Sequence, residues 1–235
     1  PKGYLINWVP NDMKAVLSQN DLSPLVHRWH PRIFAYNSEA YPNGSPVTNI
    51  WELTEEKWKS KVIIQDLSQN PATRAFFAQL LLHPEVLEKS YEEFYGKKLE
   101  MTEENASWEF MKRLFANDVI TLGSDTDISE AIGAKGQKDP PIGLITLTKM
   151  RDNQVKNLSL ATCQGLKPFM GYAVATYTEL VKNAPHPNAA KLFIRFLLTP
   201  EGIAPWLEDM GGYSPNPEGF VHPDNEGTWT DWTSK

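Results

Sequence analysis

The chain has 235 residues, of which 41% are hydrophobic and 22% charged, which is enough for one large domain or for two smaller lobes with separate cores. The net charge of -6 and the pI near 5.4 argue against a protein that coats nucleic acid or an anionic membrane, because those partners select clustered lysine and arginine. No stretch reaches the ~20 apolar residues that cross a bilayer, so direct membrane insertion is not expected.

The first half of the chain predicts strands that alternate with helices. Short apolar, β-rich runs bounded by turn residues indicate strands, and apolar residues at helical spacing indicate helices. In chain order we expect a strand at 33–37, a short helix at 49–59, a strand at 61–65 and helices at 72–83, 84–95 and 107–115.

The second half continues the pattern and ends in a tail without periodicity. The expected elements are strands at 119–122, 142–147 and 172–177, with helices at 128–135, 187–198 and 200–210, and an irregular segment at 211–235. Strands separated by helices are typical of α/β proteins, so we expect mainly parallel sheets flanked by helices on both faces.

Catalytic and metal-binding motifs are weak. His27 and His30 have a spacing that suits two metal ligands on a helix, but Pro31 follows and a strand begins at once. No serine lies in a nucleophile elbow, and no glycine-rich loop resembles a phosphate or dinucleotide motif. Cys163 is predicted to be a core residue. We therefore predict no enzyme activity, no metal and no cofactor.

Two polar turns remain as the candidate site, and both connect the end of a strand to the start of a helix. The first polar turn is 66–70 and the second polar turn is 123–127. Such turns can present free backbone N–H groups and the positive end of a helix dipole to an anionic or polar group. Ordinary helix capping explains the same residues, so both interpretations stay open here.

Three segments resemble periplasmic solute-binding proteins. They are NAPHPNAAKLFIRFLLTPEG at 183–202, FAYNSEAYPNGSPVTNIWELTEEKWKSKV at 34–62 and SDTDISEAIGAKGQKDPPIGLIT at 124–146. They occur in the order that the family has, over about residues 30 to 210, and the resemblance is closest to the ferric-binding cluster of the type II class.

The resemblance implies a two-lobed, type II periplasmic-binding fold. Residues 46–169 are expected to form lobe 2, and residues 1–45 and 170–235 a remnant of lobe 1 with the C-terminal helices and tail. Family members have a longer N-terminus that supplies the first βα units of lobe 1, so lobe 1 is expected to be incomplete here.

The resemblance also implies ligand-binding residues. The two polar turns match the turns that hold an anion in the family, Thr146 and Thr148 follow the strand after which ferric-binding members place a tyrosine pair, and Trp29 and His30 lie at the crossover. The full candidate set is Ser68, Gln69, Asn70, Thr73, Ser124, Asp125, Thr126, Thr146, Thr148, Trp29 and His30. Because the tyrosine pair is missing, ferric iron is not the expected ligand.

The function implied is that of the substrate-binding component of an ABC importer. It would trap a small polar, anionic solute, such as a sugar phosphate, a phosphonate or an organic acid, between two lobes and deliver it to a membrane permease. The expected location is periplasmic or extracellular, with lipid anchoring through a missing N-terminus left open. The alternatives are ferric binding without tyrosine ligands and a small α/β hydrolase or phosphatase that uses Asp125 or Asp127.

Overall fold

The chain divides into two compact units in the computed structural model, which describes residues 3–207 and 212–217. Unit 1 comprises Pro1–Pro31 and Ala173–Lys235, and unit 2 comprises Arg32–Tyr172. The chain passes from unit 1 into unit 2 within strand β2 (Val26–Asn37), and it returns within strand β7 (Gly171–Tyr177). Both strands therefore belong in part to each unit.

Unit 2 is built on a mixed sheet. The strand order is β4-β3-β5-β2-β6, and β7 also pairs with β2. The bounds of the strands not yet given are β3 (Val62–Gln65), β4 (Ile120–Leu122), β5 (Ile142–Thr146) and β6 (Leu160–Thr162). Strand β3 is parallel to β4 and β5, whereas β2 is antiparallel to β5 and β6.

The expectation of a mainly parallel sheet is therefore met only in part. The parallel strands β3, β4 and β5 are connected through helices, as parallel neighbours must be. Strand β2 instead enters from unit 1, and no crossover constrains it to run parallel to β5. The α/β class with helices on both faces is confirmed.

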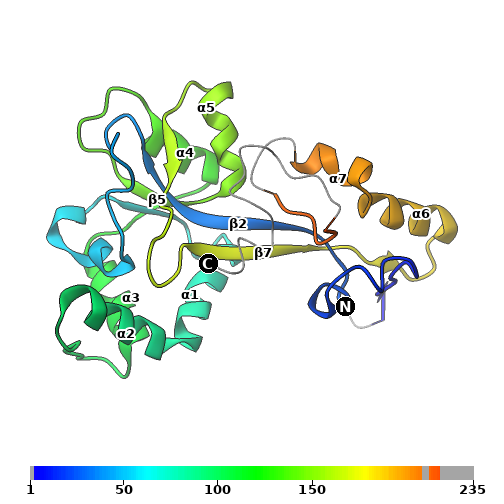
Figure 1. Cartoon of the computed structure of the whole chain (residues 1–235), viewed down its shortest axis with the longest axis horizontal. Coiled ribbons are helices and arrows are strands. Elements are labelled where there is room, and N and C mark those ends of the chain that lie inside the picture. The colour runs from blue at the N-terminus through cyan, green and yellow to red at the C-terminus, as the bar shows by residue number, and fades with distance from the viewer. Residues whose placement is uncertain (1–2, 208–211, 218–235) are drawn as a thin grey trace. The chain divides into compact units, whose positions relative to one another are not determined.

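Helices cover both faces of this sheet, as Figure 1 shows for unit 2. One face carries α1 (Pro71–Leu82), α2 (Pro84–Tyr95) and α3 (Ala106–Ala116), and the other carries α4 (Asp125–Gly133) and α5 (Asp152–Val155). Alternate strand residues enter the two cores, as a period of two requires. Phe34, Ile64 and Leu144 lie in the larger core with α1–α3, and Ala35, Ile63 and Ile145 lie in the smaller core with α4.

The short helix expected at 49–59 consists of two 3-10 helices, η2 (Ile50–Thr54) and η3 (Glu56–Trp58). Asn49 caps η2, and its side chain accepts a hydrogen bond from the Trp51 N–H. Trp51 is fully buried and packs edge-on against Tyr91 of α2 and Phe110 of α3. This indole therefore holds η2 against helices α2 and α3.

Unit 1 has a smaller core. Strand β1 (Leu5–Ile6) pairs antiparallel with β8 (Leu180–Val181), and η1 (Gln19–Asp21), α6 (Pro187–Leu197) and α7 (Pro200–Leu207) complete its regular elements among the described residues. The core contains Leu17, Leu25, Leu180, Ile194 and Leu198. Three large apolar side chains of α6 are at least half exposed, namely Leu192, Phe193 and Phe196.

Most of the expected elements are present within one to three residues of their predicted bounds. The sequence pattern did not indicate β1, η1, β6, β8, α5 or the 3-10 helix η4 (Leu147–Arg151). The predicted end of the last helix at 210 and most of the tail lie outside the described residues. Within the described part of the chain, no helix has the length and apolarity needed to span a bilayer.

Candidate functional site

A buried ion pair joins strand β2 to the start of helix α4. Arg32 lies on β2, and its Nη1 and Nη2 donate to the two carboxylate oxygens of Asp125 at 3.0 and 2.6 Å. The two side chains are only 5% and 16% exposed. A bidentate pair between a guanidinium and a carboxylate fixes direction as well as charge, so it holds the first turn of α4 against the sheet.

Gln65, the last residue of β3, links the two polar turns. Its Nε2 donates to the carbonyl of Gly123 at 2.9 Å, and its Oε1 accepts from the Asn70 side-chain amide and, at 3.4 Å, from Arg32 Nη2. The two turns follow the carboxyl ends of the parallel neighbours β3 and β4, which is where α/β proteins commonly hold ligands. The structure therefore brings Asn70 and Asp125 into one hydrogen-bonded cluster.

The first polar turn satisfies most of its own donors. The N–H of Ser68 donates to Asp66 Oδ1 at 2.8 Å, and the N–H groups of Gln69 and Asn70 donate to the Asp66 carbonyl at 3.1 and 2.9 Å. The Gln69 side-chain amide donates to Ser68 Oγ at 3.2 Å. Ser68 and Gln69 are thus placed in an exposed, internally bonded turn.

Helix α1 begins with its N-terminus fully capped. Asn70 Oδ1 accepts from the N–H groups of Ala72 and Thr73 at 2.8 and 3.0 Å, Pro71 has no N–H, and the Arg74 N–H donates to the Asn70 carbonyl. The Thr73 side chain is fully buried, and its Oγ1 has no hydrogen-bond partner among the described residues. The expectation that this turn presents free helix N–H groups to a ligand is not met, because the cap uses them.

The second polar turn is more open. Ser124 Oγ accepts from the Asp127 N–H at 3.2 Å and donates to its carboxylate at 2.8 Å. The N–H groups of Asp125 and Thr126 make no hydrogen bond within the described part of the chain. Lys149, on η4, donates from Nζ to Thr126 Oγ1 at 2.8 Å. Two free backbone donors, one hydroxyl and one ammonium group therefore meet at this helix start.

Thr146 and Thr148 lie at the end of β5, beside this cluster. Thr146 is the register partner of Arg32 in the antiparallel β2–β5 pair. The two threonine hydroxyls are 3.3 Å apart. They add neutral hydrogen-bonding groups next to the Arg32–Asp125 pair.

Trp29 and His30 belong to unit 1, unlike the other nine candidates. The Trp29 indole N–H donates to Asp21 Oδ1 at 2.9 Å, and its backbone N–H and carbonyl pair with Tyr213, both at 2.8 Å. His30 Nδ1 lies 3.3 Å from Thr176 Oγ1. The cluster described above is built from unit 2 residues alone.

Three residues of the cluster were not predicted from the sequence. Arg32, Gln65 and Lys149 provide the two positive charges and the amide that connects the turns. Two of these residues had a signal in the sequence, because each is a polar residue next to an apolar strand. Arg32 precedes the run IFAY, and Gln65 follows the run VII. Lys149 has no such signal, because it lies in an unpredicted 3-10 helix.

The described residues show no metal site. No group of three or more His, Cys, Asp or Glu side chains within ranges 3–207 and 212–217 is arranged to hold an ion. His27 Nδ1 instead lies 2.6 Å from Thr178 Oγ1. Cys163 is buried, and burial raises the pKa of its thiol to about 12, so it stays protonated and is not a nucleophile.

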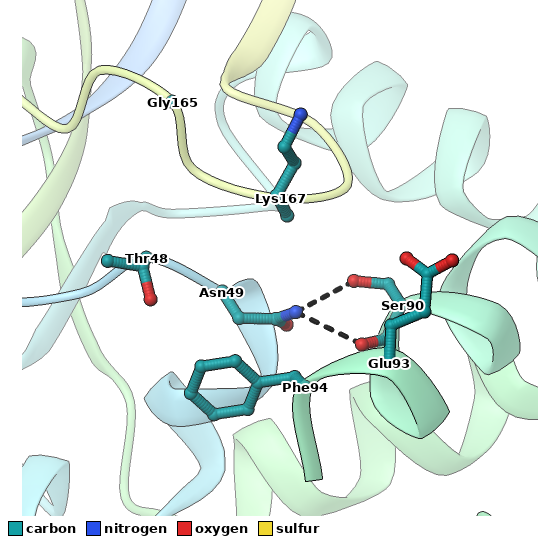
Figure 2. A pocket seen from close by; sticks show the side chains of 7 residues that line it. All are labelled: Thr48, Asn49, Ser90, Glu93, Phe94, Gly165 and Lys167. Atoms are coloured by element: carbon teal, nitrogen blue, oxygen red, sulfur yellow. Dashed lines mark hydrogen bonds between the residues drawn. The ribbon is translucent and has the colours of Figure 1, made fainter. Parts of the chain in front are cut away.

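A separate pocket of about 270 Å³ lies on unit 2, and Figure 2 shows the residues that line it. Its floor is held by Asn49, whose Nδ2 donates to the carbonyl and the hydroxyl of Ser90 at 3.1 and 2.8 Å. Glu93, Phe94 and Lys167 form an exposed rim. None of the predicted site residues lines this pocket, and its floor amide is already bonded within the protein, so the cluster around Arg32 remains the candidate site.

Comparison with sequence families and curated proteins gives one match. A sequence profile described as bacterial extracellular solute-binding protein matches residues 25–233. No curated protein matches the chain significantly by sequence. The profile covers most of the chain and includes the whole Arg32 cluster.

Solved structures with the same fold include two iron-bound proteins and one ABC-transporter substrate-binding protein. Iron-bound HitA from Pseudomonas aeruginosa is 14% identical with a TM-score of 0.70, over 98% of this chain and 69% of that protein. An ABC-transporter substrate-binding protein from Agrobacterium tumefaciens is 13% identical with a TM-score of 0.66, over 99% and 62%. A Trichodesmium protein named IdiA or FutA, in complex with iron and citrate, is 18% identical with a TM-score of 0.61, over 94% and 67%. The chain thus spans about two thirds of the length of these proteins.

Proposed function

Because the chain belongs to the bacterial extracellular solute-binding proteins, the type II binding proteins of ABC transporters, we propose that its Arg32 cluster binds the anionic group of a small polar solute. The family acts in the periplasm or outside the cell. Delivery of the solute to a membrane permease is part of this proposal. A sugar phosphate, a phosphonate or an organic acid has the required chemistry.

The start of helix α4 is the observation that carries the proposal. The N–H groups of Asp125 and Thr126, which have no hydrogen bond among the described residues, lie at the positive end of the helix dipole. Lys149 Nζ lies 2.8 Å from the Thr126 hydroxyl and is only 14% exposed, so it adds a partly desolvated positive charge. An oxyanion placed there would accept hydrogen bonds from two backbone groups and one ammonium group.

Three carboxylates lie near this helix start, and Asp152 Oδ2, 3.6 Å from Lys149 Nζ, offsets part of that ammonium charge. Asp125 is bonded by Arg32 through both oxygens, so its charge is neutralised where it lies. Asp127 accepts from the Ser124 hydroxyl. The threonines Thr146 and Thr148 are suited to hydroxyl or amide groups elsewhere on the solute.

We assign unit 2 to lobe 2 of the two-lobed fold and unit 1 to part of lobe 1. Two observations support the assignment. Unit 2 contains a complete mixed sheet with helices on both faces, and unit 1 has only a two-stranded sheet of its own and a smaller core. The matched structures extend beyond this chain by about one third of their length.

A ligand screen with two variants tests the proposal. Sugar phosphates, phosphonates and carboxylates are compared by thermal shift, because a ligand that binds only the native state raises the melting temperature. The solute found should bind at least ten times more weakly to Lys149→Gln, which loses one charged hydrogen bond worth about 1.5–3 kcal/mol. The control is Lys135→Gln, an exposed lysine of unit 2 bonded to Asn157. Equal loss in both variants, or no loss in either, would contradict the proposed site.

Ferric binding is the second candidate, and it is favoured by the iron that HitA and the Trichodesmium protein hold. The chain has Thr146-Leu147-Thr148 where the resemblance to ferric-binding proteins implies a tyrosine pair, and its described residues have no cluster of metal-binding side chains. The screen therefore includes ferric salts with and without citrate. If only ferric salts raise the melting temperature, and Lys149→Gln does not change that rise, ferric binding replaces the anion proposal.

A further inference from the structure

Arg28, on the unit 1 part of β2, has no counterion among the described residues. Its side chain makes no hydrogen bond or ion pair with residues 3–207 or 212–217, and its Nε is buried without an acceptor. Arg28 is only partly exposed, and a charge that is partly withdrawn from water without a partner costs free energy. Arg28 is therefore a group whose partner is expected from outside the described structure.

The surroundings of Arg28 are aromatic and basic. The guanidinium carbon lies over the indole of Trp206 on α7, 4.9 Å from the ring centroid. The ring of His27 approaches the same indole edge-on, with 6.2 Å between centroids. Trp206 is 46% exposed, so this cluster is open to solvent. A cation–π contact orients a guanidinium but leaves its positive charge uncompensated.

The pKa values of these groups respond to burial first and, for His27, to the charge of Arg28 second. Burial lowers the pKa of Arg28 from its ordinary value. Burial, and then the nearby charge of Arg28, lower the pKa of His27 to about 4, so His27 is neutral at pH 7. His27 faces the Thr178 hydroxyl, the backbone of Thr176, whose hydrogen bond partly raises the His27 pKa, and the Trp206 indole, and none of these supplies a negative charge.

We propose that unit 1 carries its own oxyanion-binding site, in which the guanidinium of Arg28, held over Trp206 and beside His27, takes a carboxylate or phosphate group. The planar guanidinium presents paired N–H donors that match two oxygens of such a group. His27 and Thr178 supply the neutral polar edge of the site. No residue of this site belongs to the Arg32 cluster, so the inference does not rest on the proposed function.

Inorganic phosphate is the probe, added to the whole chain at pH 7 with ionic strength matched by sodium chloride. We expect calorimetry to show binding to the wild type that weakens at least tenfold in Arg28→Gln and is partly retained in Arg28→Lys. The control Arg195→Gln removes a surface guanidinium of unit 1 that is already paired with Asp12 at 2.8 Å, and it should bind phosphate normally. Lys149→Gln should also bind normally at this site, which separates this inference from the proposed function.

A second measurement does not depend on comparing affinities of variants. Phosphate beside Arg28 would offset its charge, so the pKa of His27 should rise when phosphate is added, as followed by NMR of the histidine ring protons. The chain has five histidines, and His27 is assigned from a His27→Gln spectrum. An unchanged His27 titration in saturating phosphate, or equal phosphate binding by the wild type and Arg28→Gln, would overturn the proposal.

Discussion

Arg32 and Arg28 lie four positions apart on the same strand, yet their surroundings differ. Arg32, in unit 2, bonds both oxygens of a carboxylate that is 93 residues away in sequence. Arg28, in unit 1, lies over the Trp206 ring and beside His27, and it has no counterion among the described residues. The comparison teaches that a fully buried arginine such as Arg32 needs a counterion from the fold, whereas a partly exposed one such as Arg28 can leave its positive charge for a ligand.

The largest expected effect is the loss of stability when the Arg32–Asp125 ion pair is broken. Asp125→Ala should destabilise the protein by about 3–5 kcal/mol, because it leaves the Arg32 charge buried without its partner. Urea unfolding followed by circular dichroism measures this loss. The double variant Arg32→Met with Asp125→Leu replaces the pair by apolar groups and should recover most of it. A loss below about 1 kcal/mol for Asp125→Ala would show that water already screens the pair.

The next effect concerns the pH dependence of unit 1. The pKa of His27 is about 4 in the folded protein, against an ordinary value of 6.5, because of burial first and Arg28 second. As the pH falls, His27 takes up a proton in the unfolded chain near pH 6.5 but in the folded protein only near pH 4. The free energy of unfolding therefore decreases between pH 6.5 and pH 4. Allowing for solvent screening, the loss is about 2 kcal/mol. His27→Gln should remove this part of the slope, and identical slopes in urea titrations of both proteins would refute it.

A smaller effect distinguishes the two polar turns. Asn70→Ala should cost about 1 kcal/mol or somewhat more, because Asn70 caps two N–H groups of α1 and also bonds Gln65. Ser124→Ala removes a single longer cap bond at 3.2 Å and should cost less. The melting temperatures of the two variants, measured by thermal unfolding, show which substitution costs more stability. The reverse order would mean that the second polar turn, and not the first, is the more tightly fixed one.

The smallest effect is expected at the unpaired arginine. Arg28→Met keeps a long apolar side chain over Trp206 and removes a charge that has no described counterion, so stability should change by less than about 1 kcal/mol. Measured without added phosphate, the change should be neutral or stabilising. A loss above about 2 kcal/mol would show that Arg28 has a counterion in the folded protein.

The sequence predicted local structure better than the contacts between distant segments. Helices α1 to α3 were expected within a residue or two, because their caps and apolar spacing are local signals. Strands β1 and β8 have two residues each, which is too short for any alternating pattern. The antiparallel direction of β2 depends on how the chain crosses between units, and no local pattern encodes that.

The candidate site shows the same division. The two polar turns were recognisable because each lies between a strand and a helix, and the structure places them in one cluster. The role of each turn was not predictable, because Asn70 uses the N–H groups of α1 for its cap while α4 keeps two unbonded. The Arg32–Asp125 pair joins residues that nothing in the sequence connects.

The division of unit 1 into two chain segments has a consequence for biosynthesis. Unit 2 is one continuous segment, Arg32–Tyr172, whereas unit 1 needs residues from before and after it. A ribosome adding about 5–20 residues per second completes unit 2 while the first part of unit 1, including Arg28, waits roughly ten to thirty seconds for α6 and α7. During translation, unit 2 can therefore fold before the segment ahead of Arg32 meets α6 and α7.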